Sequence, residues 1–283
     1  MLKDVIKNGI VCISLLLCVF LAGCGRNQTA NIPETEDTTL TVTAIKAGAA
    51  DAFLLTTDNH VTIIDTGLEK KADELVEFLN EQGVTRVDEL IITHFDKDHV
   101  GGADHILTEF EVGTVYTTYY SKESDDISAY QEALAAAGLS ETQVKELTTY
   151  EADGVTYAIY PPKATEYAEN TSNNSSLVIK VSVGDNSMLF AGDAEKERIE
   201  ELLQTKGLQA TILKVPHHGR YNENSQALID YVSPSYAIIT SSNSEPEDQE
   251  ELDALNSAEV ITYLTRDGDI TIRISSSEVE ISQ

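Results

Sequence analysis

Short apolar runs alternate with amphipathic segments along the chain, and this pattern predicts an α/β protein. Runs rich in Val, Ile, Leu and Thr predict strands at residues 40–46, 52–57 and 61–65. Between residues 72 and 79 apolar side chains recur at helical spacing, so we expect a helix that stops at Gly83. The continuation predicts a buried strand at 89–93, a helix at 103–110, a strand at 113–118 and a helix at 127–137.

The second half of the chain repeats this plan. Between residues 177 and 215 it predicts two paired strands, a helix and a further strand. In both halves a carboxylate ends one strand and a histidine ends the next: Asp65 precedes His94, and Asp193 precedes His217. Two pseudo-repeated halves of this kind predict two packed sheets with helices outside. One site is expected at the edge where the strand ends converge.

Composition allows a large core and limits the partners. Of the 283 residues, 41% are hydrophobic and 24% are charged, as in globular proteins. Lys and Arg number 19 against 48 Asp and Glu, and the net charge of −29 excludes a general nucleic-acid binder with a basic face. The expected substrate is a small molecule or a polymer, and nucleic acid is a candidate that this charge disfavours.

The N-terminal residues are typical of an exported protein. Lys3 and Lys7 precede an apolar run at residues 10–22 that is shorter than the roughly 20 residues needed to span a bilayer. The small residues before Cys24 resemble a bacterial lipoprotein signal, in which that cysteine is acylated and becomes the mature N-terminus. The alternative is a short anchor helix that is never cleaved. Both place the body outside the cytoplasmic membrane.

Three segments are therefore predicted: a lipoprotein signal peptide at 1–23, a flexible polar linker at 24–39 and a folded domain at 40–283. The acidic domain would be repelled by an anionic membrane, so lipid on Cys24 is its only expected membrane contact. All three cysteines lie within the first 24 residues, which excludes cysteine-ligated zinc in the domain.

The loop after the strand predicted at 89–93 carries the richest chemistry. Within six residues it places four candidate metal ligands: His94, Asp96, Asp98 and His99. The two carboxylates would repel each other, and carboxylates and imidazoles alike would lose hydration, so one or two divalent cations would resolve that cost. The alternative is a solvated polar loop. We favour the metal site because Asp65, Asp193, His217 and His218 end the neighbouring strands.

The same loop belongs to an ordered series of short motifs. They are AGAADA at 47–52, IDTG at 64–67, THFDKDHVGG at 93–102, NNSSLV at 173–178, LFAGD at 189–193 and LKVPHHG at 213–219. In this order they resemble the metallo-β-lactamase superfamily, and specifically the metallo-hydrolase domain of ComEC-type competence proteins. The resemblance covers about residues 40–275 and implies a four-layer αββα sandwich.

The resemblance also implies roles for individual residues. His94 and Asp96 would hold a first divalent metal ion, and Asp98 and His99 a second, with Asp98 also the catalytic residue. Asp193 would bridge both ions, and either His217 or His218 would complete the second site. Residues expected to support or flank these ligands are Asp65, which would fix the signature loop, and Asn173 or Asn174, which stand where other branches supply a further histidine.

The implied activity is hydrolysis of phosphodiester or similar ester bonds by a hydroxide that bridges the two cations. Zinc, manganese and magnesium are candidates, and the carboxylate-rich set leans toward manganese or magnesium. Lys97, Lys214 and Arg220 are candidate substrate-binding residues. Two alternatives stay open: a cell-envelope esterase, and an inactive extracellular module that binds metal and a partner.

Several positions depart from the family pattern. Ala50 replaces a glycine, and the segment after the strand at 236–240 reads SSNSEPED in place of a histidine-containing one. Six acidic residues between Glu245 and Asp253 are expected to crowd the same rim and to discourage phosphodiester binding. His60 and His105 are interpreted as residues outside the metal site.

Overall fold

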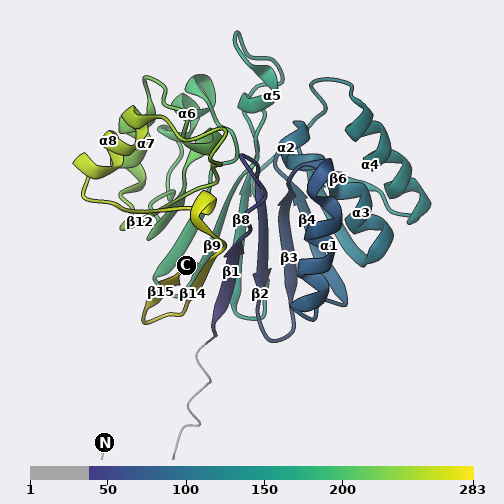
Figure 1. Cartoon of the computed structure of the whole chain (residues 1–283). Coiled ribbons are helices and arrows are strands. Elements are labelled where there is room, and N and C mark those ends of the chain that lie inside the picture. Colours follow the sequence, from purple (N-terminus) through teal and green to yellow (C-terminus); the bar gives the residue numbers. More distant parts are fainter. Residues whose placement is uncertain (1–37) are drawn as a thin grey trace, which may run out of the picture. The chain divides into compact units, whose positions relative to one another are not determined.

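Two β-sheets lie face to face between two layers of helices (Figure 1). This confirms the four-layer αββα arrangement predicted from the sequence. The computed structural model describes residues 38–283, so the predicted signal peptide, Cys24 and nearly all of the predicted linker lie outside the described residues. Within residues 38–283 no helix is both long enough and apolar enough to cross a membrane.

The first sheet has the strand order β15-β14-β1-β2-β3-β4-β5-β6. β3 pairs in parallel with β4, and β4 with β5, so their carboxyl ends meet at one edge. The strands are β1 (Leu40–Ala44), β2 (Ala52–Thr56), β3 (Val61–Thr66), β4 (Arg86–Ile92), β5 (Glu111–Thr117), β6 (Glu141–Gln143), β14 (Ile270–Ile274) and β15 (Val279–Ser282).

The second sheet has the order β13-β12-β11-β10-β9-β8-β7. β10, β11, β12 and β13 are successive parallel neighbours, which again collects their carboxyl ends at one edge. The strands are β7 (Thr148–Ala152), β8 (Val155–Tyr160), β9 (Val178–Val183), β10 (Asn186–Phe190), β11 (Ile212–Lys214), β12 (Tyr236–Ile239) and β13 (Ile261–Leu264).

Helices cover the outer face of each sheet. In Figure 1 one group lies beside the first sheet and the other beside the second, with α5 above the strand ends. The helices are α1 (Ala72–Glu81), α2 (Lys97–Val100), α3 (Ala103–Glu109), α4 (Asp125–Ala136), α5 (Thr171–Asn174), α6 (Lys196–Leu202), α7 (Ser225–Val232) and α8 (Gln249–Ser257), with short 3-10 helices η1 (Glu69–Lys71), η2 (Pro216–Gly219) and η3 (Thr265–Asp267).

Three apolar clusters hold the four layers together. Successive strand residues point to opposite faces, so Phe53 joins the cluster between the sheets while Leu54 joins the one beneath α1 and α3. In β10, Phe190 faces the other sheet and Leu189 faces the helices α6 and α7. Phe53 and Phe190 meet edge to face across the interface, with ring centroids 5.1 Å apart.

The C-terminal hairpin departs from the two-halves plan. β14 pairs antiparallel with β1, placing Ile274 opposite Leu40, and so joins the first sheet instead of the second. Runs such as Ile270–Ile274 are short, and their partner is chosen by contacts between distant parts of the chain. The sequence pattern therefore did not predict this hairpin. It also did not predict β6 to β8, β13 or the helices α5, α7 and α8.

Candidate metal centre

The candidate site lies at the edge where the carboxyl ends of the parallel strands meet. Asp65 is the penultimate residue of β3 and His94 follows β4 in the first sheet, whereas Asp193 follows β10 and His218 follows β11 in the second. The pairings β3–β4 and β10–β11 are both parallel, which brings these loops together from opposite sheets. The predicted convergence of strand ends is therefore present.

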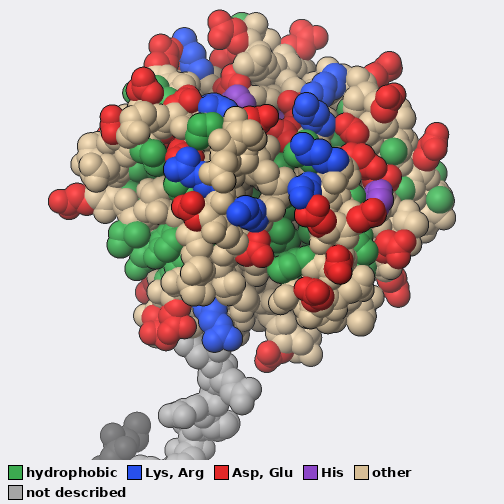
Figure 2. Space-filling model, viewed as in Figure 1, with side chains coloured by type: hydrophobic (Ala, Val, Ile, Leu, Met, Phe, Trp, Pro, Cys, Tyr) green, Lys and Arg blue, Asp and Glu red, His purple; other side chains and the backbone are tan. Residues whose placement is uncertain are grey.

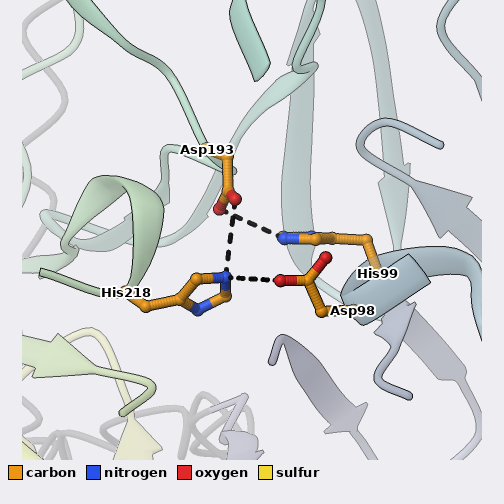
Figure 3. Close-up of side chains that lie close together, drawn as sticks. All are labelled: Asp98, His99, Asp193 and His218. Carbon is orange, nitrogen blue, oxygen red and sulfur yellow. Dashed lines mark ion pairs between the residues drawn. The ribbon is translucent and has the colours of Figure 1, made fainter. Parts of the chain in front are cut away.

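Four side chains form the tightest group (Figure 3). Asp98, His99, Asp193 and His218 each offer a ligand atom within 4.8 Å of the others. His99 Nε2 lies 3.1 Å from Asp193 Oδ1, and His218 Nε2 lies 3.4 Å from both Asp98 Oδ2 and Asp193 Oδ2. Separations of about 3 to 4 Å are those between ligands of one divalent cation held at about 2 Å.

A second group shares Asp193. His94 Nε2 lies 3.9 Å from Asp193 Oδ2 and 3.9 Å from Asp96 Oδ2. Asp96 is held from outside by an ion pair with Lys122 and a hydrogen bond from Ser172. The carboxylate of Asp193 therefore stands between two sets of ligand atoms, which is the arrangement expected of a bridging ligand.

The three histidines are oriented by bonds to their other ring nitrogen. His99 donates its Nδ1–H to Asp65 Oδ2 over 2.7 Å, and His218 Nδ1 lies 3.1 Å from the carbonyl oxygen of Thr240. His94 Nδ1 lies 3.2 Å from the hydroxyl of Thr93. The carboxylate and carbonyl acceptors place the proton of His99 and His218 on Nδ1. The Thr93 hydroxyl donates to Asp65 Oδ2 at 2.7 Å and therefore accepts from Nδ1 of His94, so the Nε2 atom of each ring faces the site. Asp65 also accepts from the Thr93 amide at 2.7 Å, so it joins the end of β3 to the signature loop, as the resemblance implies.

Four buried polar atoms test whether a metal fits. Nε2 of His94, His99 and His218 and Oδ1 of Asp193 have no hydrogen-bond partner among the described residues. Buried polar atoms left unpaired are costly, and all four belong to the groups that surround Asp193. Divalent cations would satisfy every one of them, so the donor set fits a metal centre.

Burial and neighbouring charges set the pKa values of the candidate metal ligands. Burial would raise the pKa of Asp193, yet the charges of His218 and His99 hold it well below its ordinary range. Burial would also raise the pKa of Asp98, but the neighbouring imidazoles of His218 and His99 lower it to about 2. Burial and the neighbouring His99 lower the pKa of His94 to about 3. Both carboxylates are thus ionised and His94 is neutral, as metal ligands must be. Burial would lower the pKa of His99 and of His218, but the charge of Asp193 raises both, so a cation that binds their Nε2 atoms would displace a proton from each ring.

Backbone strain gathers at the same edge. Asp65, His217 and His218 have positive φ angles of 56°, 47° and 54°, a conformation that residues other than glycine rarely adopt. Gly101 permits a close approach, since a Cβ there would lie 2.4 Å from the Glu69 amide nitrogen and 2.4 Å from the Lys97 carbonyl oxygen. The fold therefore holds these loops in shapes that local sequence alone disfavours.

The two adjacent histidines separate in space. His218 is buried in the cluster, whereas His217 is about a third exposed and points its Nδ1 toward Glu195 Oε1 at 3.2 Å. Asn173 donates to the same Glu195 over 2.8 Å. Asn174 accepts from the Arg198 amide at 2.9 Å and so positions the start of α6. His217 and both asparagines thus border the cluster without joining it.

Two predicted substrate residues are engaged elsewhere. Arg220 donates to the Pro246 carbonyl at 2.8 Å and to Asp248 Oδ1 at 3.0 Å. Lys214 is fully buried, forms an ion pair with Asp51 and donates to the Gly192 carbonyl at 3.0 Å. The prediction that Lys214 contacts substrate is therefore wrong, because its ammonium group has no access to solvent.

The structure adds Asp51 to the site. Its carboxylate accepts from Thr240 Oγ1 at 2.6 Å and lies 3.4 Å from His218 Nδ1. Burial would raise the pKa of Asp51, but the charge of Lys214 and the hydrogen bond from His218 lower it. Sequence analysis placed Asp51 only within a motif. The sequence signal that could have identified Asp51 as a site residue was its position just before β2, in the same motif as Gly48.

The acidic segment after β12 is arranged differently from the expectation. Glu247 and Glu251 are buried, and Glu247 pairs with Arg266 over 2.9 Å. Asp248 pairs with Arg220. Three of the six carboxylates therefore do not crowd the rim as expected, because Glu247 and Glu251 are buried and Glu247 and Asp248 pair with arginines. The other three, Glu245, Glu250 and Asp253, are exposed. His60 and His105 contact Glu89 and Asp73, outside the cluster around Asp193.

Comparison with known proteins agrees with this geometry. A family model described as "Metallo-beta-lactamase superfamily" matches residues 45–241. ComE operon protein 3 of Bacillus subtilis is 32% identical over 168 residues, covering 59% of this chain and 21% of that protein. Competence protein ComA of Neisseria gonorrhoeae is 28% identical over 226 residues, covering 79% of this chain and 30% of that protein. The chain thus spans less than a third of either relative's length.

A solved structure agrees in fold. Igni18, described as a novel metallo hydrolase from Ignicoccus hospitalis, aligns with a TM-score of 0.52 at 14% identity, over 87% of this chain and 99% of that one. Residues 45–241, which the family model matches, include every ligand candidate around Asp193. The chain therefore belongs to the metallo-beta-lactamase superfamily and is similar to part of the ComEC-type competence proteins.

Proposed function

We propose that this protein is a hydrolase that uses two divalent metal ions to cleave phosphodiester or similar ester bonds. The observation that carries the proposal is the position of Asp193. Its carboxylate stands between His94 and Asp96 on one side and Asp98, His99 and His218 on the other. Two cations there would lower the pKa of a water, orient the ester and neutralise charge in the transition state.

The residues of the chain would preorganise this reaction. Asp65 and Thr240 fix the rings of His99 and His218, so their Nε2 atoms need no rearrangement. The side chain of Asp98 is 25% exposed, against 3% for Asp193, so it lies on the open side of the cluster. The side chain of Asp96 is 24% exposed, so Asp98 and Asp96 are the ligands placed to meet a substrate.

The proposed ligands comprise three imidazoles and three carboxylates. Imidazole favours zinc and similar transition metals, whereas carboxylate favours manganese and magnesium. A site with both imidazole and carboxylate ligands favours a metal that binds both types, so manganese and zinc are the proposed ions.

One experiment tests the activity. The purified protein is loaded with manganese or zinc, its metal content is measured, and hydrolysis of bis(p-nitrophenyl) phosphate and p-nitrophenyl acetate is followed. Asp193→Asn should abolish turnover and reduce metal content, whereas Asp185→Asn, at an exposed turn, should change neither. Preference for the carboxyl ester would support a cell-envelope esterase. A fully loaded protein that hydrolyses neither compound would support the binding module.

Attachment to the outer side of the cytoplasmic membrane through lipid on Cys24 is part of the proposal. It is supported by the short apolar run and the small residues before Cys24. Mass spectrometry of the membrane fraction should find an acylated N-terminal Cys24. Cys24→Ser should block this maturation, and Cys18→Ser, within the predicted leader, should allow it. An intact Met1 terminus would contradict the proposal.

A further inference from the structure

A groove opens beside Asp98. Its inner part is a hollow of about 180 Å³ whose lining includes Asp98, Lys70 and Lys97. Its outer part is a hollow of about 540 Å³ whose lining includes Lys46 and Arg266. The two parts are continuous, since both are lined by Gly48, Lys71, Ser242 and Ser244.

Basic side chains gather along this groove. Lys46, Lys70, Lys71, Lys97 and Arg266 all line it, although the whole chain has only 19 Lys and Arg against 48 Asp and Glu. Figure 2 shows Lys and Arg side chains collected over the upper half of the face drawn, with Asp and Glu spread around them. The groove is therefore a cationic path on an acidic protein.

Three of these cations are available to a ligand. Lys71 pairs with Glu74, and Arg266 pairs with Glu247. Lys46, Lys70 and Lys97 are exposed and form no ion pair within the described part of the chain. Asp98 and Glu245 are the carboxylates of the inner hollow, and Asp98 is a proposed metal ligand. With acidic residues in such excess, unpaired lysines beside the site point to an anion from outside.

We propose that this groove binds the flanking phosphates of a linear poly-phosphodiester while the metal centre holds the scissile one. The inference rests on the proposed phosphodiesterase function and names its substrate class. A small diester carries one negative charge, which the two metal ions alone would neutralise. A polymer carries further phosphates that the metals do not reach, and ammonium groups with nearby hydroxyls, such as those of Ser242 and Ser244, bind them.

The net charge of −29 does not oppose this binding. At physiological ionic strength the Debye length is about 8 Å, so exposed carboxylates on other faces are largely screened from the groove. The lysines that line the groove therefore decide its local potential.

Binding of labelled polymers by the metal-loaded protein tests the inference. The probes are an oligothymidylate and poly(glycerol phosphate), which share phosphodiester chemistry and differ in source. Three lysine contacts predict a slope of log affinity against log salt of about −2 for a single strand. Lys46→Ala/Lys70→Ala should weaken binding by roughly tenfold and flatten the slope to about −0.7. The control Lys145→Ala/Lys206→Ala removes the same charge from exposed positions away from the groove and should retain wild-type affinity and slope.

Preference for either polymer identifies the source of the substrate and supports the inference. Equal effects of the two double variants, or no binding of either polymer, would overturn it. Hydrolysis of bis(p-nitrophenyl) phosphate separates the two proposals. If this compound is cleaved while neither polymer binds, the groove assignment fails and the proposed function stands. If the polymers bind through the lysines and nothing is cleaved, the groove assignment stands and the proposed function fails.

Discussion

The ammonium group of Lys214 and the carboxylate of Asp51 form an ion pair that is entirely buried beside the proposed metal ligands. Lys214 also lies 3.8 Å from Asp193 Oδ1, and Asp51 lies 3.4 Å from His218 Nδ1. This pair joins β11 of the second sheet to the segment before β2 of the first. It places one fixed positive charge under a cluster of carboxylates.

Removing one partner of this pair should cost stability. Lys214→Met would leave Asp51 as an uncompensated buried charge, so the free energy of unfolding should fall by about 3–5 kcal/mol. Urea denaturation measures this loss, with Lys206→Met at an exposed position as the control. The double variant Asp51→Asn/Lys214→Met should lose less than the sum of the single variants. Strict additivity would show that the two groups do not interact.

The two adjacent histidines should differ in metal binding. His218→Ala removes a buried Nε2 within 3.4 Å of Asp98 and Asp193, so the protein should lose about one of two bound ions. His217→Ala removes a ring that faces Glu195, and both ions should be retained. Elemental analysis after gel filtration compares the two variants. The assignment of His218 is wrong if the variants lose metal in the opposite order.

Asp65 should control affinity without touching the metal. Its carboxylate orients His99 through a 2.7 Å hydrogen bond, and loss of such a partner typically weakens metal binding by about 10–100-fold. Asp65→Asn should therefore show this loss in calorimetric titration with zinc, while circular dichroism reports a folded protein. Asp58→Asn, in the exposed turn before β3, serves as the control. Unchanged zinc affinity in Asp65→Asn would show that Asp65 does not control metal binding through His99.

Glu251 should make stability depend on pH. Burial raises its pKa from 4.5 to about 7, and Oε2 has no hydrogen-bond partner among the described residues. The folded protein keeps this proton to a higher pH than the unfolded chain. The stability it contributes is complete below about pH 4.5 and falls by about 3 kcal/mol as the pH rises through 7.

Glu251→Gln removes this titration. The variant should therefore be more stable than the wild type at pH 8, by up to about 3 kcal/mol, with little difference at pH 4.5. Urea denaturation at both values provides the comparison. Glu250→Gln lies on the exposed side of the same helix and should not reproduce the gain. A wild type that is the more stable protein at pH 8 would contradict the prediction.

Local sequence determined the layers and most of the site. Apolar runs of strand length and helical spacing located β1 to β5 and β9 to β11, because these elements bury one face in a regular period. His94, Asp96, Asp98 and His99 stand within six residues, so their proximity needed no tertiary information. The order of the motifs then pointed to Asp193 as their common partner.

Only the tertiary structure decided the rest. His217 and His218 are chemically identical neighbours, and the path of the chain after β11 sends one ring into the cluster and the other outward. Lys214 and Asp51 are 163 positions apart, and burial turned an expected substrate contact into an internal ion pair. The groove is assembled from the loop after β1, η1, the start of α2, the loop after β12 and η3, so its charge depends on how these segments pack. The strength and purpose of a charge depend on its neighbours in space and on its burial, which local sequence does not contain.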